Sequence, residues 1–558
     1  MFKKSNTDRQ LDAFSSVVNM LGNTALKNYN DPTHWHNQFR EQITNRIEES
    51  LFSILFDEQM GAPNASIRIL IGMMILKEAF GWSDSQLSEQ CQFNLLNRSA
   101  LGLFNMNDGL TAPSTYYLLR KRIHDHQRQT GEDLLGKVFE NTTTQQVREF
   151  NVNGQSIRMD SKLLGSNIAV FSRYEIIHQT LSRFYNSLSE DLKMQLAKTD
   201  KDQLEELVRE ESSKTVYHST KEQIKGRLQP IGFLIYKVLK TYVDFQTEPL
   251  ELLQRVFSEQ YKTDETQQVE LRSKEEISSS TVQSPHDPDS AYRNKDKHPV
   301  KGYSVNVAET CSEDSLNLIT SVKVEKANVP DTSFVQPAIE QTIEVTGQKV
   351  EKVYADGAYQ SPANDQYCQE IDMVFTGIQG FEPRWDLDMT PQGLWVTDTQ
   401  TGEVIKAIPV KKNKKSKEDR WRIKISTGKP VYFDQKAIRA SQLRRKMKQR
   451  SLEELHKRNN VEATIFQLSY HLKHNKSKYR GIVKQGMWVA CRCLWINLVR
   501  IMNFLKQTCQ RTNLMSKLAD LGALFDYKYF FHPDRIPLAI RNSCTSFSAI
   551  IFLTILIL

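Results

Sequence analysis

Three acidic residues stand in settings that suit phosphate chemistry, and the first is Glu462. The apolar residues around it keep a three-to-four spacing that predicts a helix: Val461, Ile465, Leu468 and Leu472. Cations follow this helix: Lys473, Lys476, Lys478, Arg480 and Lys484. A lone carboxylate followed by bases suits metal-dependent phosphate chemistry, and an ordinary solvated helix with a charge pattern has the same appearance.

The other two acids each close a short run with β character. Residues 156–160 alternate apolar and polar and end in Asp160, so we expect a strand with this acid at its C-terminal end. Residues 350–356 repeat the pattern and end in Asp356, and Ser361 then opens a helix. Divalent cations such as Mg²⁺ prefer carboxylate oxygens, and two such ions clamp the oxygens of an in-line phosphoryl displacement.

These acids are 196 and 106 residues apart, so only a fold that gathers two strand ends and one helix at one sheet edge brings them together. Between the first two acids, we expect an antiparallel pair over 303–308 and 316–324 and a helix over 333–345. Residues 373–376 are expected as a further strand. The resulting order is strand, strand, strand, helix, strand.

The first 150 residues are expected to be helical. Apolar periodicity predicts one or two helices over 35–56 and another over 65–80, and Ser83 with Gln86 forms a capping box that opens a third. Ser114 is expected to open a fourth helix, which carries the cations Arg120, Lys121 and Arg122. A DNA-binding domain of helix-turn-helix type and a packing or dimerisation domain both fit this pattern.

Two insertions are expected. Leucine and phenylalanine spacing makes residues 172–271 mostly helical, and residues 273–289 are expected to be a mobile linker in which His286 and Asp287 form a turn rather than bind metal or DNA. Residues 380–450 are β-rich and basic: from Lys406 to Arg450 there are 17 Lys or Arg against three acids, a net charge of +14. Interleaved aromatics favour a folded, DNA-facing insert over a solvated basic loop. The residues expected to contact DNA there are Lys411, Lys412, Lys414, Lys415, Arg420 and Trp421.

Several motifs resemble the DDE transposases of bacterial insertion sequences, which carry a ribonuclease H-like catalytic core. They are Met159-Asp160-Ser161, Tyr354-Ala355-Asp356-Gly357-Ala358-Tyr359, Val461-Glu462-Ala463 with Phe466-Gln467-Leu468, and Tyr479-Arg480-Gly481. Further likeness lies in Ser284–Arg293, Lys301-Gly302-Tyr303 and Glu309-Thr310, and the N-terminal third resembles an InsH-type domain. The resemblance extends from about Trp35 to about Phe504.

The resemblance implies a catalytic triad of Asp160, Asp356 and Glu462 that holds two Mg²⁺ ions, with Mn²⁺ as a substitute. It implies cleavage and strand transfer at the ends of the element, with double-stranded DNA as partner and a homodimer that pairs two ends. A catalytically silent DNA-binding relic and a nuclease of the same fold are the alternatives. Related transposases often carry a Lys two helical turns after the Glu, where this chain has Ser469, so we expect Arg480 and Lys484 to compensate.

The expected fold is mixed α+β. It comprises a helical domain over 1–150, a ribonuclease H-like core over 151–504 with the two insertions, and a tail over 505–558. With 558 residues, 39% hydrophobic and 25% charged, the chain has the composition of a protein with a packed core, and its net charge of +8 permits nucleic acid as partner. Seven scattered cysteines without a CxxC pair indicate reduced thiols and no zinc site. We expect no signal peptide, no membrane contact of the ten apolar residues at 549–558, and a bacterial cytoplasmic, nucleoid-associated location.

Overall fold

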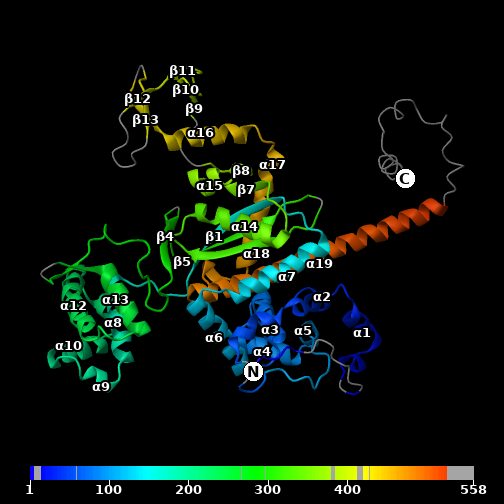
Figure 1. Ribbon diagram of the computed structural model, residues 1–558, viewed down its shortest axis with the longest axis horizontal. Helices are drawn as coiled ribbons and strands as arrows, with labels where there is room; N and C mark the ends of the chain where they lie inside the picture. The colour runs from blue at the N-terminus through cyan, green and yellow to red at the C-terminus, as the bar shows by residue number, and fades with distance from the viewer. Residues whose placement is uncertain are drawn as a thin grey trace. The chain divides into compact units, whose positions relative to one another are not determined.

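In a computed structural model, the protein has a mixed α+β fold with a helical N-terminal region (Figure 1). The structure describes residues 1–5, 14, 16–57, 60–264, 267–295, 297–313, 315–378, 384–410, 419–425 and 428–524, without the side chains of 509–524. The chain divides into two compact units, 1–500 and 501–558.

The N-terminal region is built from helices. Its α-helices are α1 (Asn23–Asn30), α2 (Trp35–Gln42), α3 (Ile67–Phe80), α4 (Asp84–Phe93), α5 (Leu95–Ala100), α6 (Pro113–Thr130) and α7 (Leu134–Phe150). Short 3₁₀ segments lie at η1 (Val17–Met20), η2 (Thr44–Arg46) and η3 (Glu49–Leu55). The capping box at Ser83 and Gln86 is confirmed at the start of α4.

Two expectations for this region are corrected. The predicted helix over 35–56 ends at Gln42, because Ile43 leaves the helical backbone region (φ −126°, ψ −68°), and the apolar spacing continues on 3₁₀ segments instead. Helix α6 begins at Pro113 rather than Ser114, because proline at the first helical position gives up no hydrogen bond there.

A six-stranded sheet forms the centre of the molecule. Its strands are β1 (Ser156–Gly165), β4 (Ala291–Lys295), β5 (His298–Thr310), β6 (Ile319–Lys326), β7 (Lys352–Asp356) and β8 (Asp372–Thr376). Strand β5 lies between β1 and β6 and pairs antiparallel with both, whereas β7 is parallel to β1 and β8 parallel to β7. Around the sheet lie η4 (Asp331–Phe334), α14 (Val335–Thr346), η5 (Gly357–Tyr359) and α15 (Pro362–Tyr367).

The apolar face of this sheet packs against α14. Ile157 and Met159 of β1 and Val353 and Ala355 of β7 are fully buried in one cluster with Ile339 and other residues of the helix. The strands predicted over 303–308, 316–324, 350–356 and 373–376 and the helix over 333–345 are confirmed. Strand β1, however, continues five residues beyond Asp160, because β5 pairs with it as far as Gly165.

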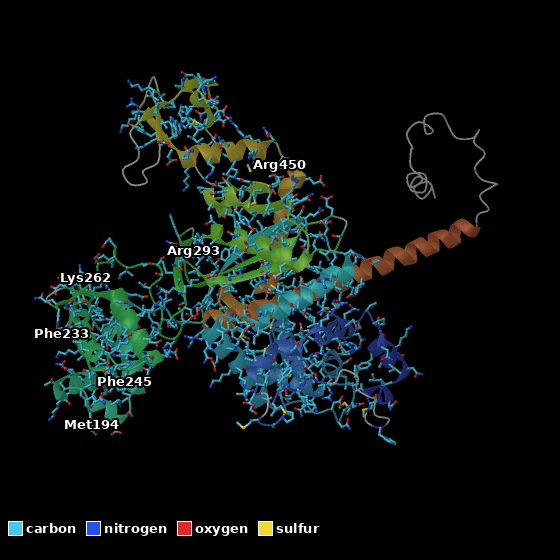
Figure 2. All side chains as sticks on the ribbon, viewed as in Figure 1. Met194, Phe233, Phe245, Lys262, Arg293 and Arg450 are labelled. Atoms are coloured by element: carbon cyan, nitrogen blue, oxygen red, sulfur yellow. The ribbon has the colours of Figure 1, made fainter. Side chains whose placement is uncertain are left out.

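The helical insertion has a hydrophobic core of its own and forms a distinct cluster of helices in Figure 1. It contains α8 (Arg173–Ser187), α9 (Glu190–Lys193), α10 (Lys198–Arg209), α11 (Ser212–His218), α12 (Lys221–Thr241), α13 (Glu248–Gln260) and the hairpin β2 (Tyr261–Thr263) and β3 (Val269–Leu271). The prediction of a mostly helical segment is confirmed up to Gln260. Met194 and Phe233 lie on its exposed surface (Figure 2).

The predicted mobile linker over 273–289 is wrong for its second half, which is packed into the protein. This stretch has no helix or strand, yet Ser284 and Asp287 are fully buried and a turn closes from the Asp287 amide to the Ser284 carbonyl. The turn expected at His286 and Asp287 is therefore confirmed.

The second insertion contains two small sheets and a helix. They are β9 (Trp385–Thr390), β10 (Gly393–Asp398) and β11 (Val404–Lys406), then β12 (Ile408–Val410), β13 (Arg420–Ile423) and β14 (Val431–Asp434), followed by α16 (Gln435–Lys448). Trp385, Ile423, Phe433 and Ile438 share one core, which confirms the expected β-rich insert.

After this insert the chain returns to the central sheet. It forms α17 (Leu452–His456), η6 (Lys457–Asn459), α18 (Asn460–Ser469), η7 (Lys473–Asn475) and α19 (Ile482–Leu524), which has residues in both units. Arg450 ties the start of α17 to β8 through Asp372 (Figure 2). Within α19, Ile482–Thr508 is long and apolar enough to cross a membrane, and 61% of its most apolar 18-residue window is buried inside the protein, as in a core helix.

Candidate active site

Asp160 and Asp356 lie side by side on neighbouring parallel strands. The pairing of β1 with β7 runs from Ser156 opposite Lys352 to Arg158 opposite Tyr354, and two more residues in the same register bring Asp160 level with Asp356. Side chains alternate along a strand, so both acids project from the face opposite α14. Sheet order therefore joins two carboxylates that are far apart in the chain.

The Asp160 carboxyl has a raised pKa. Burial is the largest cause, and the neighbouring Asp356 adds to it, while Arg458 and the Ser161 amide act in the opposite direction. A buried carboxylate beside a second carboxylate is costly unless a cation offsets the charge. Arg458 supplies one such positive charge beside Asp160.

Helix α18 covers this face of the sheet and carries Glu462 in its first turn. The Arg458 guanidinium, one turn earlier, lies between two of the predicted acids: its Nη2 is 3.1 Å from Asp160 Oδ2 and its Nη1 is 3.1 Å from Glu462 Oε1. Glu462 is 61% exposed, whereas Arg458 is only 13% exposed. Arg458 was not among the residues predicted from sequence, although its position four residues before Glu462 is a recognisable helix-pair spacing.

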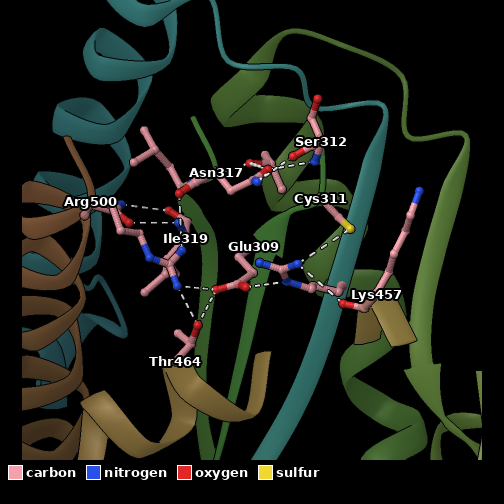
Figure 3. A network of polar contacts seen from close by, with 12 residues as sticks. Glu309, Cys311, Ser312, Asn317, Ile319, Lys457, Thr464 and Arg500 are labelled. Carbon is pink, nitrogen blue, oxygen red and sulfur yellow. Dashed lines mark hydrogen bonds and ion pairs between the residues drawn. The ribbon is translucent and has the colours of Figure 1, made fainter. Parts of the chain in front are cut away.

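A buried ion network holds α18 on the sheet (Figure 3). The Glu309 carboxylate of β5 has no exposed surface and accepts hydrogen bonds from Arg158 Nε at 2.5 Å, Arg500 Nη2 at 2.6 Å and Thr464 Oγ1 at 2.5 Å. Arg158 belongs to β1, Thr464 to α18 and Arg500 to α19. One carboxylate thereby links the strand of Asp160 to the helix of Glu462.

The pKa of Glu309 is lowered despite complete burial. Burial alone would raise it, but the guanidinium groups of Arg500 and Arg158 and the Thr464 hydroxyl favour the charged form more strongly. The sequence offered one signal for this residue, an acid within an otherwise buried strand, and no role was assigned to it. Glu309 therefore remains charged while it links β1, α18 and α19.

A second buried acid, Asp287, fixes the end of β1. It accepts hydrogen bonds from the Ser166 hydroxyl, from Tyr303 OH at 2.5 Å and from the Gly481 amide at 3.1 Å. Its pKa is raised, chiefly by burial. Asp287 therefore joins the turn after the helical insertion to β5 and to the start of α19, and it is a structural residue.

The three predicted acids differ in how well they suit a divalent metal. Their carboxylate oxygens have the chemistry that Mg²⁺ prefers, and Asp160 and Asp356 stand level on adjacent strands. In the described ranges, however, no group of three or more His, Cys, Asp or Glu side chains is gathered closely enough to hold an ion. Asp160 and Asp356 offer carboxylate oxygens of the kind such an ion takes, and Arg458 links Glu462 to Asp160.

The basic residues of α6 are only partly available to DNA. Arg120 is ion-paired with Asp84 at 3.3 Å and lies over the Tyr116 ring, and Arg122 lies over the Phe56 ring. Lys121 is exposed and lines a cavity of about 280 Å³ together with Lys484, although the two are far apart in the chain. Lys121 and Lys484 thus share one surface hollow.

The cations between α18 and α19 divide into two groups. Lys478 and Arg480 donate to backbone carbonyls, to Gly81 at 2.8 Å and to Asn167 at 2.7 Å, and so support the fold. Lys473 and Lys476 are exposed and have no ion pair among the residues that the structure describes. These two remain open to an anionic ligand.

Of the residues of the second insertion that were predicted to contact DNA, two lie in the described part of the chain. Arg420 lies over the Tyr432 ring, 4.3 Å from its centroid, and Trp421 packs partly against the core of the insert. Lys411, Lys412, Lys414 and Lys415 lie outside the described residues. Their predicted contact with DNA stays a prediction.

Part of the chain matches a known family. Residues 26–122 match the family described as a transposase domain (DUF772), which takes in α2 to α5 and the first part of α6. The match supports a transposase, for which DNA is the implied partner. No curated protein and no solved structure matches the chain.

Proposed function

We propose that this protein is a DDE-type transposase that cleaves DNA at the ends of an insertion sequence and transfers the freed strands to a target. The observation that carries the proposal is the meeting of Asp160 and Asp356 on parallel strands, with Glu462 joined to them by Arg458, in a chain with a transposase domain. The proximity of acids from distant parts of the chain supports this proposal, because metal-dependent phosphoryl transfer uses carboxylates gathered in this way.

The sheet also supports a ribonuclease H-like core. Strands β6, β5 and β1 are antiparallel neighbours, β7 and β8 follow on the other side of β1 in parallel, and α14 lies between β6 and β7 in the chain. This is the strand and helix order that the resemblance implies. Asp356 is the last residue of β7, and Asp160 lies within the neighbouring strand β1, five residues before its end.

In this proposal Asp160, Asp356 and Glu462 hold the divalent cations. When bound, such ions polarise the scissile phosphate and lower the pKa of the attacking water or 3′-hydroxyl. Asp160 and Asp356 supply oxygens from a rigid sheet, and the ion network around Glu309 keeps α18, with Glu462, at a defined distance from it. Arg458 orients the Asp160 and Glu462 carboxylates and neutralises their repulsion.

A second candidate is a DNA-binding protein without catalytic activity. The observation that favours it is Arg458, whose guanidinium already neutralises Asp160 and Glu462 in the described site.

In either case we infer a homodimer that brings two DNA ends together and a location in the bacterial cytoplasm with the nucleoid. A nuclease that cuts without joining is the third outcome of the test.

The deciding experiment measures Mg²⁺-dependent nicking and strand transfer on duplexes that carry the ends of the element. The wild type is compared with Asp356→Asn and with a control variant, Glu453→Gln. The control also removes one negative charge, but from an exposed acid of α17. Asp356→Asn should lose activity by at least about 100-fold, because a catalytic ion contributes several kcal/mol to the transition state and about 1.4 kcal/mol is tenfold. Glu453→Gln should match the wild type.

The other outcomes are distinct. A wild type that binds these ends without cutting them establishes the silent DNA-binding protein, and one that cuts without joining establishes the nuclease. Equal cleavage by the wild type and Asp356→Asn would show that the proposed site is wrong.

A further inference from the structure

Lys162 stands two residues after Asp160 on β1, so its side chain projects from the same face of the sheet. Its Nζ donates a 2.8 Å hydrogen bond to Ser469 Oγ at the end of α18. The Ser469 hydroxyl in turn donates to the backbone carbonyl of Ile465 at 3.0 Å. The ammonium is thereby held beside the acidic site by a neutral group.

Lys162 differs from its neighbours on this face in having no acid partner. Arg158 is paired with Glu309, and Asp160 is paired with Arg458. Among the described residues, Lys162 makes no ion pair, although its side chain is partly buried. A partly buried ammonium normally has an anion for a partner, and one serine hydroxyl leaves two of its three N–H donors free.

Further unpaired cations continue from this position. After Lys162, β1 runs to Gly165, which forms a parallel bridge with Lys476. Lys473 opens the short segment η7 and Lys476 directly follows its end, and both lysines are exposed without an ion pair in the part of the chain that the structure describes. Positive charge therefore extends from the acidic site along the end of β1, as a groove for a polyanion requires.

We propose that Lys162 is a phosphate-binding residue for the DNA strand that enters the site, with Lys473 and Lys476 holding the phosphates beyond it. Two residues of a strand span about 6.6 Å, so Lys162 reaches a phosphate one or two nucleotides from a phosphate held at Asp160. The hydrogen bond to Ser469 holds the Lys162 ammonium in position for this contact. This inference rests on the proposed function, because it assumes that DNA occupies the site.

The test is a salt titration of DNA affinity with the full chain and an element-end duplex. Lys162→Met keeps the apolar stem and removes the charge, Lys162→Arg keeps the charge, and Lys349→Met is the matched control at a surface lysine paired with Glu370. Losing one phosphate contact should lower the slope of log K against log salt by about 0.9. If the variant and the wild type bind equally at about 1 M salt, this difference in slope makes the variant bind about eightfold more weakly than the wild type at about 0.1 M salt.

We expect Lys162→Met to show this loss, Lys162→Arg to restore most of it, and Lys349→Met to bind as the wild type does. Thermal unfolding of each variant reports whether the fold is kept. A slope and affinity of Lys162→Met equal to those of the wild type would overturn the inference. Binding is measured without Mg²⁺, so a wild type that binds but never cuts refutes only the catalytic proposal, while one that binds no DNA refutes both.

Discussion

At the scale of single residues, the site depends on charges that are paired across long sequence distances. Glu309 offsets two guanidinium groups, and Arg458 offsets two carboxylates. In each case the side chain at the centre is more buried than an ordinary charged residue. Removing the central charge leaves its partners without compensation, which costs more than the loss of a surface pair.

Glu309→Gln is expected to lower the free energy of unfolding by about 3–5 kcal/mol, because Arg158 and Arg500 then stay partly buried without a counter-charge. The control is Glu313→Gln, which removes a surface pair with Lys457 from an acid that is 64% exposed and should cost less than about 1 kcal/mol. Urea unfolding at neutral pH measures both. Equal costs for the two variants would contradict the structural role of Glu309.

Glu309 should also make the free energy of unfolding depend on pH in the acidic range. The folded-state pKa of Glu309 lies below its ordinary value of 4.5, so its contribution is complete above that pH and is lost as the pH falls toward the lower folded-state pKa. The difference in unfolding free energy between the wild type and Glu309→Gln should therefore shrink below about pH 4.5. Urea titrations at several pH values between 7 and 3 measure it, and a constant difference would show that the carboxylate is not the group responsible.

At the scale of elements, β1 organises the site. Its residues alternate between a buried apolar face against α14 and a polar face against α18, and Arg158, Asp160 and Lys162 all lie on the polar face. The strand serves this purpose only because it extends beyond Asp160. That extension depends on close pairing with β5 around Gly165 and Gly302.

Gly302→Ala is expected to disturb this extension. A Cβ at Gly302 would lie 2.1 Å from the Leu164 carbonyl oxygen and 2.7 Å from the Ser166 nitrogen, and backbone atoms cannot move aside as a side chain does. We expect a loss of about 1–3 kcal/mol in the free energy of unfolding. Gly226→Ala is the control, and it is expected to raise the free energy of unfolding.

Gly226 lies inside helix α12 with open space around it, so alanine there should stabilise the protein by about 0.5–1 kcal/mol. Thermal and urea unfolding of both variants measure the pair. If Gly302→Ala were as stable as the wild type, the close approach of β5 to β1 would not be a constraint on the fold.

At the scale of the whole molecule, the helical insertion is a body with its own core. Its buried residues, among them Tyr174, Phe184, Tyr242 and Tyr261, pack with one another between Phe171 and Val282. Arg183 and Arg255 donate to the Pro285 and Pro288 carbonyls in the packed turn that follows. The central sheet is therefore interrupted in sequence without being interrupted in space.

Residues 171–283 expressed alone are expected to fold, because about 100 residues with a closed hydrophobic core can be independently stable. Residues 298–378 are the control: they contain β5 and β7 but lack β1, with which both strands pair. Circular dichroism should show a cooperative thermal transition for the first fragment and none for the second. A gradual transition in the first fragment would show that the insertion depends on the rest of the protein.

The sequence alone determined most of the local elements. The capping box at Ser83, the strand that ends at Asp356 and the helix around Glu462 all follow from interactions between residues a few positions apart. The acidic candidates could be named for the same reason, since their residue types and local settings are visible in the chain. Some predictions failed for a local reason, as where Ile43 leaves the helical region after Gln42, and others because of a distant partner, as where β5 lengthens β1 beyond Asp160.

Tertiary structure alone decided how the site is assembled. Arg458 is 298 residues from Asp160, Lys162 is 307 residues from Ser469, and Glu309 is 191 residues from Arg500. No periodicity or motif encodes such contacts, because they depend on sheet order and on which helix covers which face. The charge balance of the candidate site, and with it the inference about Lys162, exists only once β1, β5 and α18 are brought together.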